Sequence, residues 1–334
     1  MGRQATHGGP AQGARAFDVV VVGGGPAGLS AAVTLGRARR SVAVVDAGAP
    51  RNAPATAVHG FLSRDGISPV DLLAVGREEV DRYGGVCLTG EVLAVARTAD
   101  GFDVLLDDGT GLTARRLLVT TGLVDELPEV PGVRERWGRD VLHCPYCHGW
   151  EHADEPIGVL GTSARAVHQA LLFRQWTSDV VLFRHTAPAP EPDEAGQLAA
   201  RGIRVVAGTV DSLVVADDRL TGVRLSDGTV VPRRALVVGP RMVARSTVLA
   251  ALGLHSTAHP SGAGEHIAAD PTGRTDVEGV WVAGNVADLM AQVVTAASGG
   301  VTAAAAVNAD LIAEETRLAV EHAGSGAPSR LPAR

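Results

Sequence analysis

The hydrophobic pattern of the chain opens with a short apolar run that is typical of a buried parallel strand. Residues 17–22 are apolar except for Asp18, and residues 29–37 carry apolar side chains at helical spacing. A second apolar run at residues 41–45 ends at Asp46. A strand, a helix and a second strand in this order predict a βαβ unit, in which the two strands are parallel.

The pattern then changes to one amphipathic helix followed by three short strands. Residues 69–83 have the apolar spacing of a helix that covers one face of a sheet. Three runs, at residues 90–97, 102–106 and 112–118, have strand character, and the Asp-Asp-Gly sequence between the last two is a hairpin turn. These residues predict an antiparallel meander.

A second copy of this plan begins near the middle of the chain. Apolar strands at residues 157–160 and 180–183 flank a helical pattern at 164–175, and a hairpin pattern joins residues 213–215 to 223–225. The repetition of a βαβ unit followed by a meander predicts two similar α/β domains.

The end of the chain returns to the first copy. An apolar run at residues 280–283 is followed by a long Ala-rich helical pattern from about residue 292 to about residue 315. The second copy therefore interrupts the first, which resumes after about Gly239. We expect nested domains, because the strand and the helix at the end complete the fold that the first residues begin.

Length, charge and composition narrow the classes of protein. The 334 residues suit two domains, and the net charge of −7 without a block of basic residues disfavours nucleic-acid binding. The first residues lack the apolar core of a secretion signal, and the apolar stretch at 293–307 is too short and too rich in Gly and Ser to span a bilayer. We expect a cytoplasmic protein that does not bind membranes.

The first βαβ unit carries a nucleotide-binding fingerprint, G-x-G-x-x-G, at Gly23-Gly24-Gly25-Pro26-Ala27-Gly28. Gly23 permits the tight turn, Gly25 lets the backbone approach a pyrophosphate, and Gly28 lets the helix touch the strand. The helix N-terminus then faces the phosphates, and Asp46 at the end of the second strand accepts hydrogen bonds from ribose hydroxyls.

The middle of the chain contains His143-Cys144-Pro145-Tyr146-Cys147-His148-Gly149. Two cysteines at C-x-x-C spacing at a helix start favour a redox-active dithiol, since such motifs lower the pKa of a thiol. The alternatives are a zinc site, which lacks a second ligand pair downstream, and a purely structural pair. His143 either assists the chemistry or only packs. We expect the third cysteine, Cys87, to be a small core residue.

The second βαβ unit has a degraded fingerprint. The run Gly161-Thr162-Ser163-Ala164-Arg165-Ala166 has Ser163 where the central glycine of a pyrophosphate-binding turn belongs. Arg184 and Arg165 remain as possible phosphate contacts. The site is either a diverged NADPH site or one that has lost its ligand, and we favour the loss.

Two distant motifs favour FAD over NAD in the first domain. Thr120-Thr121-Gly122 and Val282-Ala283-Gly284-Asn285 look like the flavin-contacting segments of flavoprotein disulfide reductases. From about residue 17 to 319 the chain resembles the thioredoxin-reductase branch of the FAD-dependent pyridine-nucleotide-disulfide oxidoreductases. The resemblance implies these FAD contacts: Gly23, Gly25, Pro26, Ala27, Gly28, Asp46, Ala47, Arg51, Asn52, His59, Val92, Thr121, Gly122, Gly284, Asn285, Gln292 and Val293.

The resemblance also implies the architecture, which is α/β with two nested Rossmann-like dinucleotide-binding domains, and a homodimer. The expected parts are a disordered N-terminal tail at 1–16, an FAD-binding domain at 17–122 and 240–320, an NAD(P)H-like domain with the cysteine pair at 123–239, and a C-terminal tail at 321–334.

The dithiol segment separates the chain from ordinary thioredoxin reductases, which have an Asp as the acid where this chain has His148. The run Cys144–Glu151 is similar to that of the dithiol oxidases that close disulfides in small natural products, such as those of the gliotoxin and holomycin pathways. The resemblance implies that Cys147 faces the flavin, that Cys144 meets the substrate, and that His148 takes a proton from a substrate thiol.

Three functions remain open on the sequence. The first is an FAD-dependent oxidase that takes a small-molecule dithiol and O2 and releases H2O2 in antibiotic biosynthesis. The second is an NADPH-dependent thioredoxin or disulfide reductase. The third is a flavin-binding redox sensor or sequestering protein without turnover. No metal is expected in any of them.

Overall fold

The computed structural model describes residues 15–324, which form two compact units. The first unit contains the described residues up to Pro50, then Asp71–Leu123 and the residues from Ala244 onward. The second contains Arg51–Val70 and Val124–Val243. The chain thus leaves the first unit and returns to it, so the units are nested in sequence.

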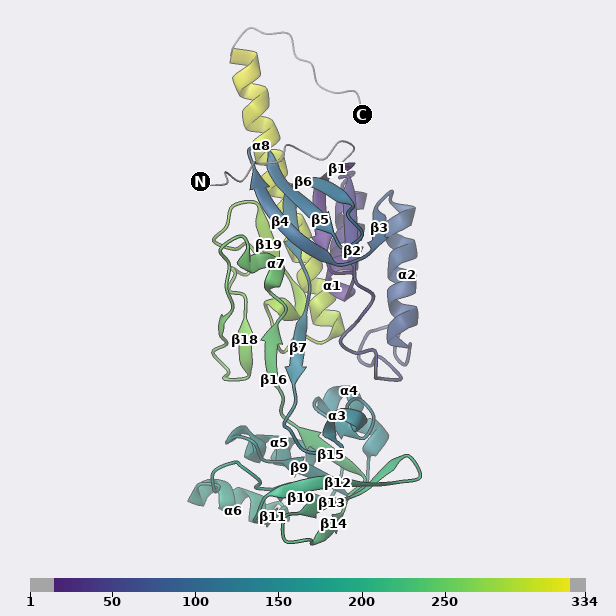
Figure 1. Ribbon diagram of the computed structural model, residues 1–334, viewed down its shortest axis with the longest axis vertical. Helices are drawn as coiled ribbons and strands as arrows, with labels where there is room; N and C mark the ends of the chain where they lie inside the picture. Colours follow the sequence, from purple (N-terminus) through teal and green to yellow (C-terminus); the bar gives the residue numbers. More distant parts are fainter. Residues whose placement is uncertain (1–14, 325–334) are drawn as a thin grey trace, which may run out of the picture. The chain divides into compact units, whose positions relative to one another are not determined.

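The main sheet of the first unit has seven strands in the order β3-β2-β1-β6-β5-β4, with β19 paired to β6 (Figure 1). The strands β3, β2, β1, β6 and β19 are parallel, and β4, β5 and β6 form the antiparallel meander. The strands are β1 (Arg15–Val22), β2 (Val42–Asp46), β3 (Val86–Thr89), β4 (Val92–Thr98), β5 (Gly101–Leu106), β6 (Gly111–Val119) and β19 (Val280–Val282).

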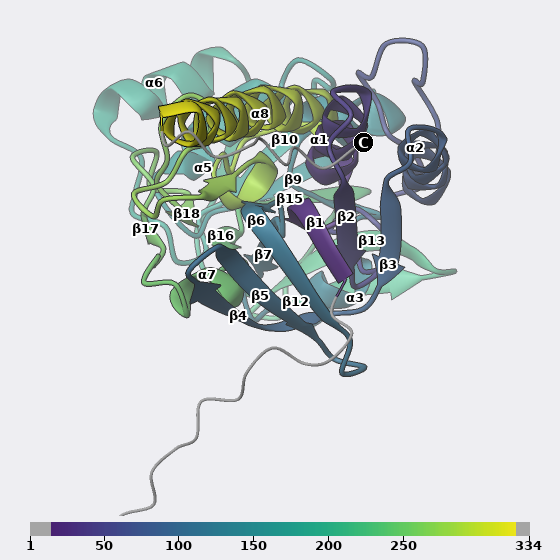
Figure 2. The same ribbon diagram turned by 90° about the horizontal axis from the view of Figure 1, so that it is seen from above.

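Two helices, α1 (Pro26–Arg37) and α8 (Val293–Gly324), lie side by side on one face of this sheet (Figure 2). Their contact is made by small residues, because a Cβ on Gly300 of α8 would lie 2.0 Å from the carbonyl oxygen of Ala27 in α1. α2 (Pro69–Arg82) follows β2 in the chain. The apolar core between α1, α8 and the sheet is made largely of Val, Ala and Leu.

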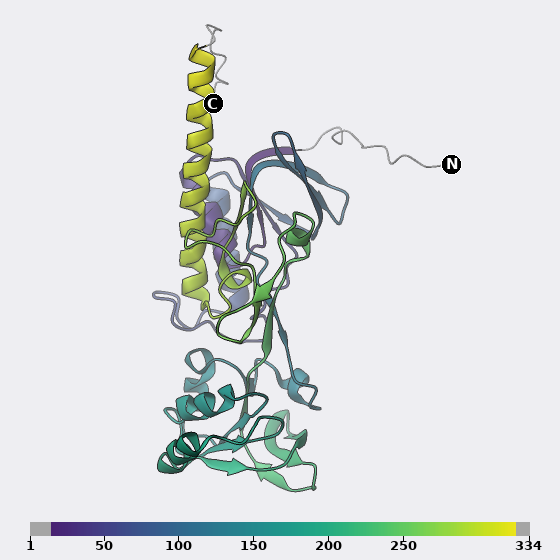
Figure 3. The same cartoon turned by 90° about the vertical axis from the view of Figure 1, so that its left-hand side faces the viewer.

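The last turns of α8 project beyond the rest of this unit (Figure 3). The helix is longer than expected, since it continues to Gly324 rather than ending near residue 315. By length and composition alone it could cross a membrane, so the expectation that this stretch is too short was wrong. Core helices pass the same test, and α8 buries Ala296, Ala303 and Val307 on the side that packs in the core.

The second unit contains a parallel five-stranded sheet in the order β11-β10-β9-β15-β8 and an antiparallel three-stranded sheet β12-β13-β14. α5 packs against β9 and β10, as in a βαβ unit. The strands are β8 (Val141–Leu142), β9 (Ile157–Leu160), β10 (Val180–Phe183), β11 (Arg204–Val206), β12 (Val210–Ala216), β13 (Arg219–Leu225), β14 (Val230–Pro232) and β15 (Ala235–Val238), and the helices are α3 (Val133–Arg136), α4 (Pro145–His148), η1 (Trp150–His152), α5 (Arg165–Phe173) and α6 (Pro192–Ala200).

The chain crosses between the units on either side of residues 51–70, and again through two short strands, β7 (Leu123–Glu126) and β16 (Arg241–Ala244). In the second unit Arg241 forms an ion pair with Glu126 at 2.6 Å, and in the first the amide of Arg245 donates to the carbonyl of Gly122. The remaining elements of the first unit are α7 (Thr247–Ala250), β17 (Thr257–Ala258), β18 (Gly264–His266) and η2 (Gly284–Val286).

The structure differs from the predicted division of the chain at several places. Leu123, expected in the second domain, groups with the first unit, and residues 240–243, expected in the FAD-binding domain, group with the second. Residues 51–70, expected in the FAD-binding domain, group with the second unit. Arg15 and Ala16, expected in the N-terminal tail, begin β1, and residues 321–324, expected in the C-terminal tail, end α8. The other residues of the two predicted tails, 1–14 and 325–334, lie outside the described residues.

Candidate active site

The Gly-rich turn after β1 has the close packing that its sequence predicts. A Cβ on Gly28 would lie 1.9 Å from the carbonyl oxygen of Gly23, so the first turn of α1 rests directly on the strand end. Gly23 itself has φ +108° and lies against the backbone of Thr120 at the end of β6. Any side chain at these two positions would push the helix away from the sheet.

Gly25 has a different environment, which fits a bound pyrophosphate. A Cβ built there meets no atom within 4 Å, and its backbone is extended immediately before the N-terminus of α1. Pro26 occupies the first helical position, where its missing N–H costs nothing. The free N–H groups of the helix start therefore face open space, which is the arrangement that binds the phosphates of a dinucleotide.

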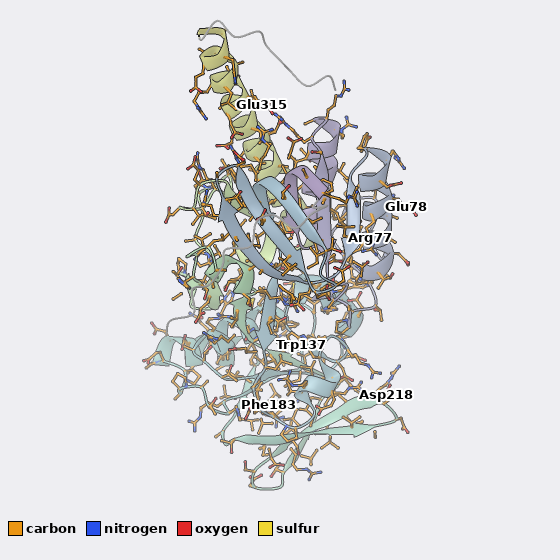
Figure 4. The ribbon with its side chains drawn as sticks, turned by 45° about the horizontal axis from the view of Figure 1, so that its top comes forward. Arg77, Glu78, Trp137, Phe183, Asp218 and Glu315 are labelled. Atoms are coloured by element: carbon orange, nitrogen blue, oxygen red, sulfur yellow. The ribbon has the colours of Figure 1, made fainter. Side chains whose placement is uncertain are left out.

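A pocket in the first unit continues from this turn. Its lining includes Gly24, Asp46, Arg77, Cys87 and Thr89, and the amide of Gly24 donates to Asp46 Oδ1 at 3.1 Å. Arg77, labelled on α2 in Figure 4, brings its guanidinium to 4.0 Å from Asp46. The carboxylate offers a hydrogen-bond acceptor and the guanidinium a donor to a ligand in this pocket.

Cys87 corrects the sequence interpretation. It was expected to be a small core residue, but its side chain is exposed and lines this pocket. Partial burial raises the pKa of its thiol. Arg77 and Thr89 were missed altogether, since an isolated Arg in a helix and a Thr at a strand end have no motif in the sequence.

The other predicted FAD residues of the first unit lie at strand and helix ends. Thr121 donates its hydroxyl to the carbonyl of Arg245 at 2.5 Å, and the side-chain amide of Asn285 donates to the carbonyl of Ala291 at 2.9 Å. Val92 is buried in the core, so its backbone alone is left for a ligand. Ala47 follows β2, Gly122 follows β6, Gly284 begins η2, and Gln292 and Val293 begin α8.

The remaining three predicted FAD residues, Arg51, Asn52 and His59, belong to the unit that carries the cysteines. Arg51 forms a two-pronged ion pair with Asp125, with both distances 2.7 Å. The carbonyl of Asn52 accepts a bond from Ala55 in a turn. The structure therefore gives Arg51 and His59 protein partners close to the dithiol that the sequence did not indicate.

The two cysteines lie on one short helical turn. Cys144 is the residue before α4, Pro145 begins the helix, and the amides of Cys147 and His148 both donate to the carbonyl of Cys144. Both cysteines are present as thiols and are partly buried. Pro145 fixes the backbone between them, so the sulfur atoms are held on adjacent positions of one turn.

The electrostatics of Cys147 differ from the expectation. A hydrogen bond with Cys144 and burial raise the pKa of the Cys147 thiol, whereas the positive charge of Arg51 lowers it. The lowering expected from a helix start is therefore not found at Cys147. The thiol–thiol hydrogen bond shows that the two sulfur atoms are in direct contact, as a dithiol that closes to a disulfide requires.

The two neighbouring histidines are held in their neutral forms. Burial lowers the pKa of His148, although the negative charge of Glu151 opposes this effect. Burial and the positive charge of Arg51 also lower the pKa of His143, whose Nδ1 donates to the carbonyl of Val238 at 3.4 Å. A neutral His148 next to a dithiol can accept a thiol proton. His143 has a backbone partner, which favours packing over assistance in the chemistry.

Trp176 packs against the turn that carries the two cysteines. A Cβ on Gly149 would lie 2.9 Å from the indole of Trp176, and the rings of Tyr146 and Trp176 meet edge to face at 5.8 Å. Gly149 is therefore required for the close packing of the turn. In contrast, Tyr146 and Trp150 expose 63% and 81% of their surfaces.

The first glycine of the second Gly-rich turn is as crowded as its counterpart Gly23 in the first turn, where a Cβ would lie 2.5 Å from the carbonyl oxygen of Thr120. A Cβ on Gly161 would lie 2.6 Å from the carbonyl oxygen of Arg184, so this glycine serves strand packing. His185 accepts a hydrogen bond on Nδ1 from the amide of Val210 at 3.0 Å, and burial lowers its pKa. Within residues 15–324 no group of three or more His, Cys, Asp or Glu side chains is arranged to hold a metal ion.

Comparison with known proteins agrees with this geometry. Residues 17–300 match the family described as pyridine nucleotide-disulphide oxidoreductase. Thioredoxin reductase sirT of Leptosphaeria maculans is 34% identical over 310 residues, which cover 87% of this chain and 93% of that protein. Thioredoxin reductase tcpT of Claviceps purpurea is 30% identical over 312 residues, covering 89% and 95%.

Solved structures show the same fold. The crystal structure of HlmI is 50% identical with a TM-score of 0.87 and covers 96% of this chain and 100% of that chain. A thioredoxin reductase TrxB from Bacillus anthracis is 29% identical with a TM-score of 0.83, covering 90% and 99%.

Fold and site together define a thiol–disulfide oxidoreductase with a flavin cofactor. The chain belongs to the pyridine nucleotide-disulphide oxidoreductase family and has the architecture of its thioredoxin-reductase members. The predicted fold class and family are thereby confirmed, as is the general class of enzyme.

Proposed function

We propose that the protein is an FAD-dependent dithiol oxidase that forms an intramolecular disulfide in a small-molecule dithiol. The observation that carries the proposal is the neutral His148 directly after Cys147, because a base at this place removes a proton from an incoming thiol. The similarity to HlmI, sirT and tcpT over nearly the whole chain supports the same conclusion. A role in antibiotic biosynthesis is part of this proposal.

The chain's own residues carry the thiol chemistry, starting from the Cys144–Cys147 disulfide. His148 takes the proton of one substrate thiol, and the resulting thiolate attacks Sγ of Cys144, which breaks the Cys144–Cys147 bond and releases Cys147 as a thiolate. His148 passes its proton to the Cys147 thiolate and takes the proton of the second substrate thiol, which attacks the substrate's own sulfur in the mixed disulfide and breaks its bond to Cys144. The substrate disulfide forms, and Cys144 leaves as the second thiol of the reduced pair.

FAD, when bound, accepts the electron pair from this dithiol and passes it to O2, so that the two substrate hydrogens leave as H2O2. The residues that would hold it are those of the first Gly-rich turn and the Asp46 pocket. Gly25 leaves room for the pyrophosphate, and Arg77 and Asp46 face the pocket beside it.

The test is an anaerobic titration of the purified protein. Excess dithiol should bleach the flavin absorbance without NADPH, and air should restore it with release of H2O2. Replacing Cys147→Ser should abolish bleaching, because Ser cannot form the disulfide. A Cys87→Ser variant is the matched control for the loss of a thiol and should bleach normally when compared at equal flavin content, because Cys87 lines the pocket of the first unit and not the dithiol turn. A Cys147→Ser protein that still bleaches would remove the dithiol from the mechanism.

The second candidate is an NADPH-dependent disulfide reductase, which is favoured by the intact β9-α5-β10 unit and by Arg165 and Arg184 near its turn. Two observations oppose this candidate. Ser163 replaces the central glycine of the turn, and a neutral His185 accepts a hydrogen bond from the amide of Val210. Rapid bleaching by stoichiometric NADPH under anaerobic conditions would establish this candidate instead. The predictions of a homodimer and of a cytoplasmic location stay predictions.

A further inference from the structure

A histidine far from the dithiol in sequence is held beside it by two carboxylates. His59 brings Nε2 to 3.2 Å from Glu151 Oε1 and Nδ1 to 3.3 Å from Asp65 Oδ2. Asp65 is fixed in turn, because its Oδ1 accepts the amide of Gly60 at 2.8 Å. With a proton on Nε2, the His59 ring donates to Glu151 and holds that carboxylate in one place, and a protonated ring donates to Asp65 as well.

Glu151 lies on the same helical face as the dithiol. Gly149, which joins α4 to η1, has φ −69° and ψ −32°, so the backbone stays helical from Pro145 to His152. Residues three and four apart on such a stretch are neighbours, which places Glu151 beside His148 and Cys147. The carboxylate is therefore the nearest side-chain anion along this stretch to the base.

We propose that Glu151 is the positioning residue of His148, and that His59 and Asp65 orient Glu151 for this task. The inference rests on the proposed function, because it assigns a partner to the base of that reaction. When a substrate thiol passes its proton to His148, neutral imidazole becomes imidazolium and the thiol becomes a thiolate. The Glu151 carboxylate compensates the new positive charge on the imidazolium.

The charges around His148 support this assignment. Burial lowers the pKa of His148 most strongly, Glu151 raises it, and His152 and His59 lower it. His152 is paired separately, with Nδ1 at 2.8 Å from Glu155 Oε2. Glu151 is thus the group that favours the protonated form of His148, whereas burial and the two neighbouring histidines disfavour that form. The His152–Glu155 pair has the same chemistry and provides a control.

The experiment measures the rate of anaerobic flavin bleaching by dithiothreitol from pH 5 to 9 in the FAD-loaded full-length protein. In Glu151→Gln we expect the acidic limb of the profile to move to lower pH, because the pKa of His148 falls when the anion is removed. We expect the plateau to fall about tenfold, because a weaker and less oriented base transfers the proton more slowly. NMR titration of histidine-labelled protein, assigned with His148→Gln, should show the same lowered pKa directly.

Three further single variants and one double variant test whether the effect belongs to the His59–Glu151 pair. Glu151→Asp keeps the charge and should restore most of the profile. His59→Gln should lower the plateau by less than Glu151→Gln without moving the acidic limb to lower pH, because His59 itself lowers the pKa of His148. The double variant should be no slower than Glu151→Gln, since the two residues act in series. Glu155→Gln should follow the wild type.

A Glu151→Gln protein with wild-type flavin content, pH profile and His148 titration would overturn the inference. So would a double variant whose losses multiply. If wild-type protein is not bleached by dithiothreitol at any pH while a lowered His148 pKa is still found in Glu151→Gln, the proposed function fails and the electrostatic pairing stands.

Discussion

Single glycines in the first nucleotide-binding turn have distinct tasks that the structure separates. Gly28 is surrounded by backbone, while Gly25 faces open space and has φ −76°, which any residue adopts. We predict that Gly25→Ala leaves the thermal unfolding of the flavin-free protein within about 0.5 kcal/mol of wild type. The same change should weaken FAD binding at least about tenfold, because the new methyl group fills the pyrophosphate space.

Gly28→Ala should behave in the opposite way. Its Cβ would meet the carbonyl oxygen of Gly23 at 1.9 Å, so the helix must shift, at a cost of about 1–3 kcal/mol to the folded state. Calorimetry of flavin-free protein and fluorescence titration with FAD distinguish the two effects. Equal destabilisation by both changes would show that Gly25 is a packing residue.

The roles of side chains were harder to predict from the sequence than the roles of backbone positions. Gly23 and Gly28 have the close packing that their spacing in the turn predicts, and the contact of Gly25 with a pyrophosphate stays a prediction. Cys87 was misplaced, because an exposed strand residue at a pocket edge has the same apolar neighbours in sequence as a core residue. His59 was assigned to FAD by resemblance, and its ion pair with Glu151 joins segments that no motif connects.

At the scale of elements, the helix α8 is tied to the sheet by a network of charges. Glu315, labelled on α8 in Figure 4, pairs with Arg40 at 2.5 Å and with Arg115 at 2.8 Å. Arg115 also contacts Asp18 and Glu314. The hydrogen bond from Arg40 is the main cause that lowers the pKa of Glu315 from 4.5 to about 2. The network anchors the helix where it leaves the apolar core.

This network predicts a loss of stability in acid. A carboxyl group whose pKa is lowered on folding stabilises the protein above its unfolded pKa, and this contribution disappears as the pH falls from 4.5 to about 2. We expect Glu315→Gln to cost about 1 kcal/mol at pH 7, a figure reduced by solvent screening because the side chain is 36% exposed. Urea denaturation between pH 2 and 7 should show a shallower acid dependence in the variant.

The control for this prediction lies on the same helix. Glu321 pairs with Arg317 at 2.9 Å, but both side chains are more than half exposed. Glu321→Gln should therefore change stability by less than about 0.5 kcal/mol at any pH. A Glu321→Gln effect as large as that of Glu315→Gln would mean that α8 gains its stability from helix charge pairs alone.

For the whole molecule, the direction of electron flow depends on whether the second unit still takes a nicotinamide nucleotide. We predict that stoichiometric NADPH does not bleach the flavin within minutes, whereas a dithiol does. Ser163→Gly should not restore reduction by NADPH, because the neutral His185 remains bound to the amide of Val210 and offers no positive charge to a 2′-phosphate.

Anaerobic stopped-flow absorbance at the flavin band measures this prediction. Ser163→Ala is the matched control, since it changes the same position without opening the turn. Fast reduction of the wild type by NADPH would reverse the assignment of electron flow. Fast reduction of Ser163→Gly alone would show that the missing glycine was the single defect of the nucleotide site.

The chain by itself predicted the kind of fold, which is confirmed, and the residues of the candidate reacting pair, which stay a prediction. Apolar runs of strand length, the Gly-rich turn and the C-x-x-C spacing are local features, and local sterics decide what such segments form. These features led to two nested dinucleotide-binding units, to FAD and to Cys144 and Cys147. They also led to His148, because its position follows the cysteines directly.

Only the tertiary structure decided which side chains surround that pair. Residues 51–70 pack in the unit of the dithiol, so Arg51 meets Asp125 and His59 meets Glu151 across large separations in sequence. Burial, which lowers the pKa of His148, likewise arises from packing. Contacts between distant segments and their desolvation depend on how the elements assemble, and no periodicity of a single segment encodes that assembly.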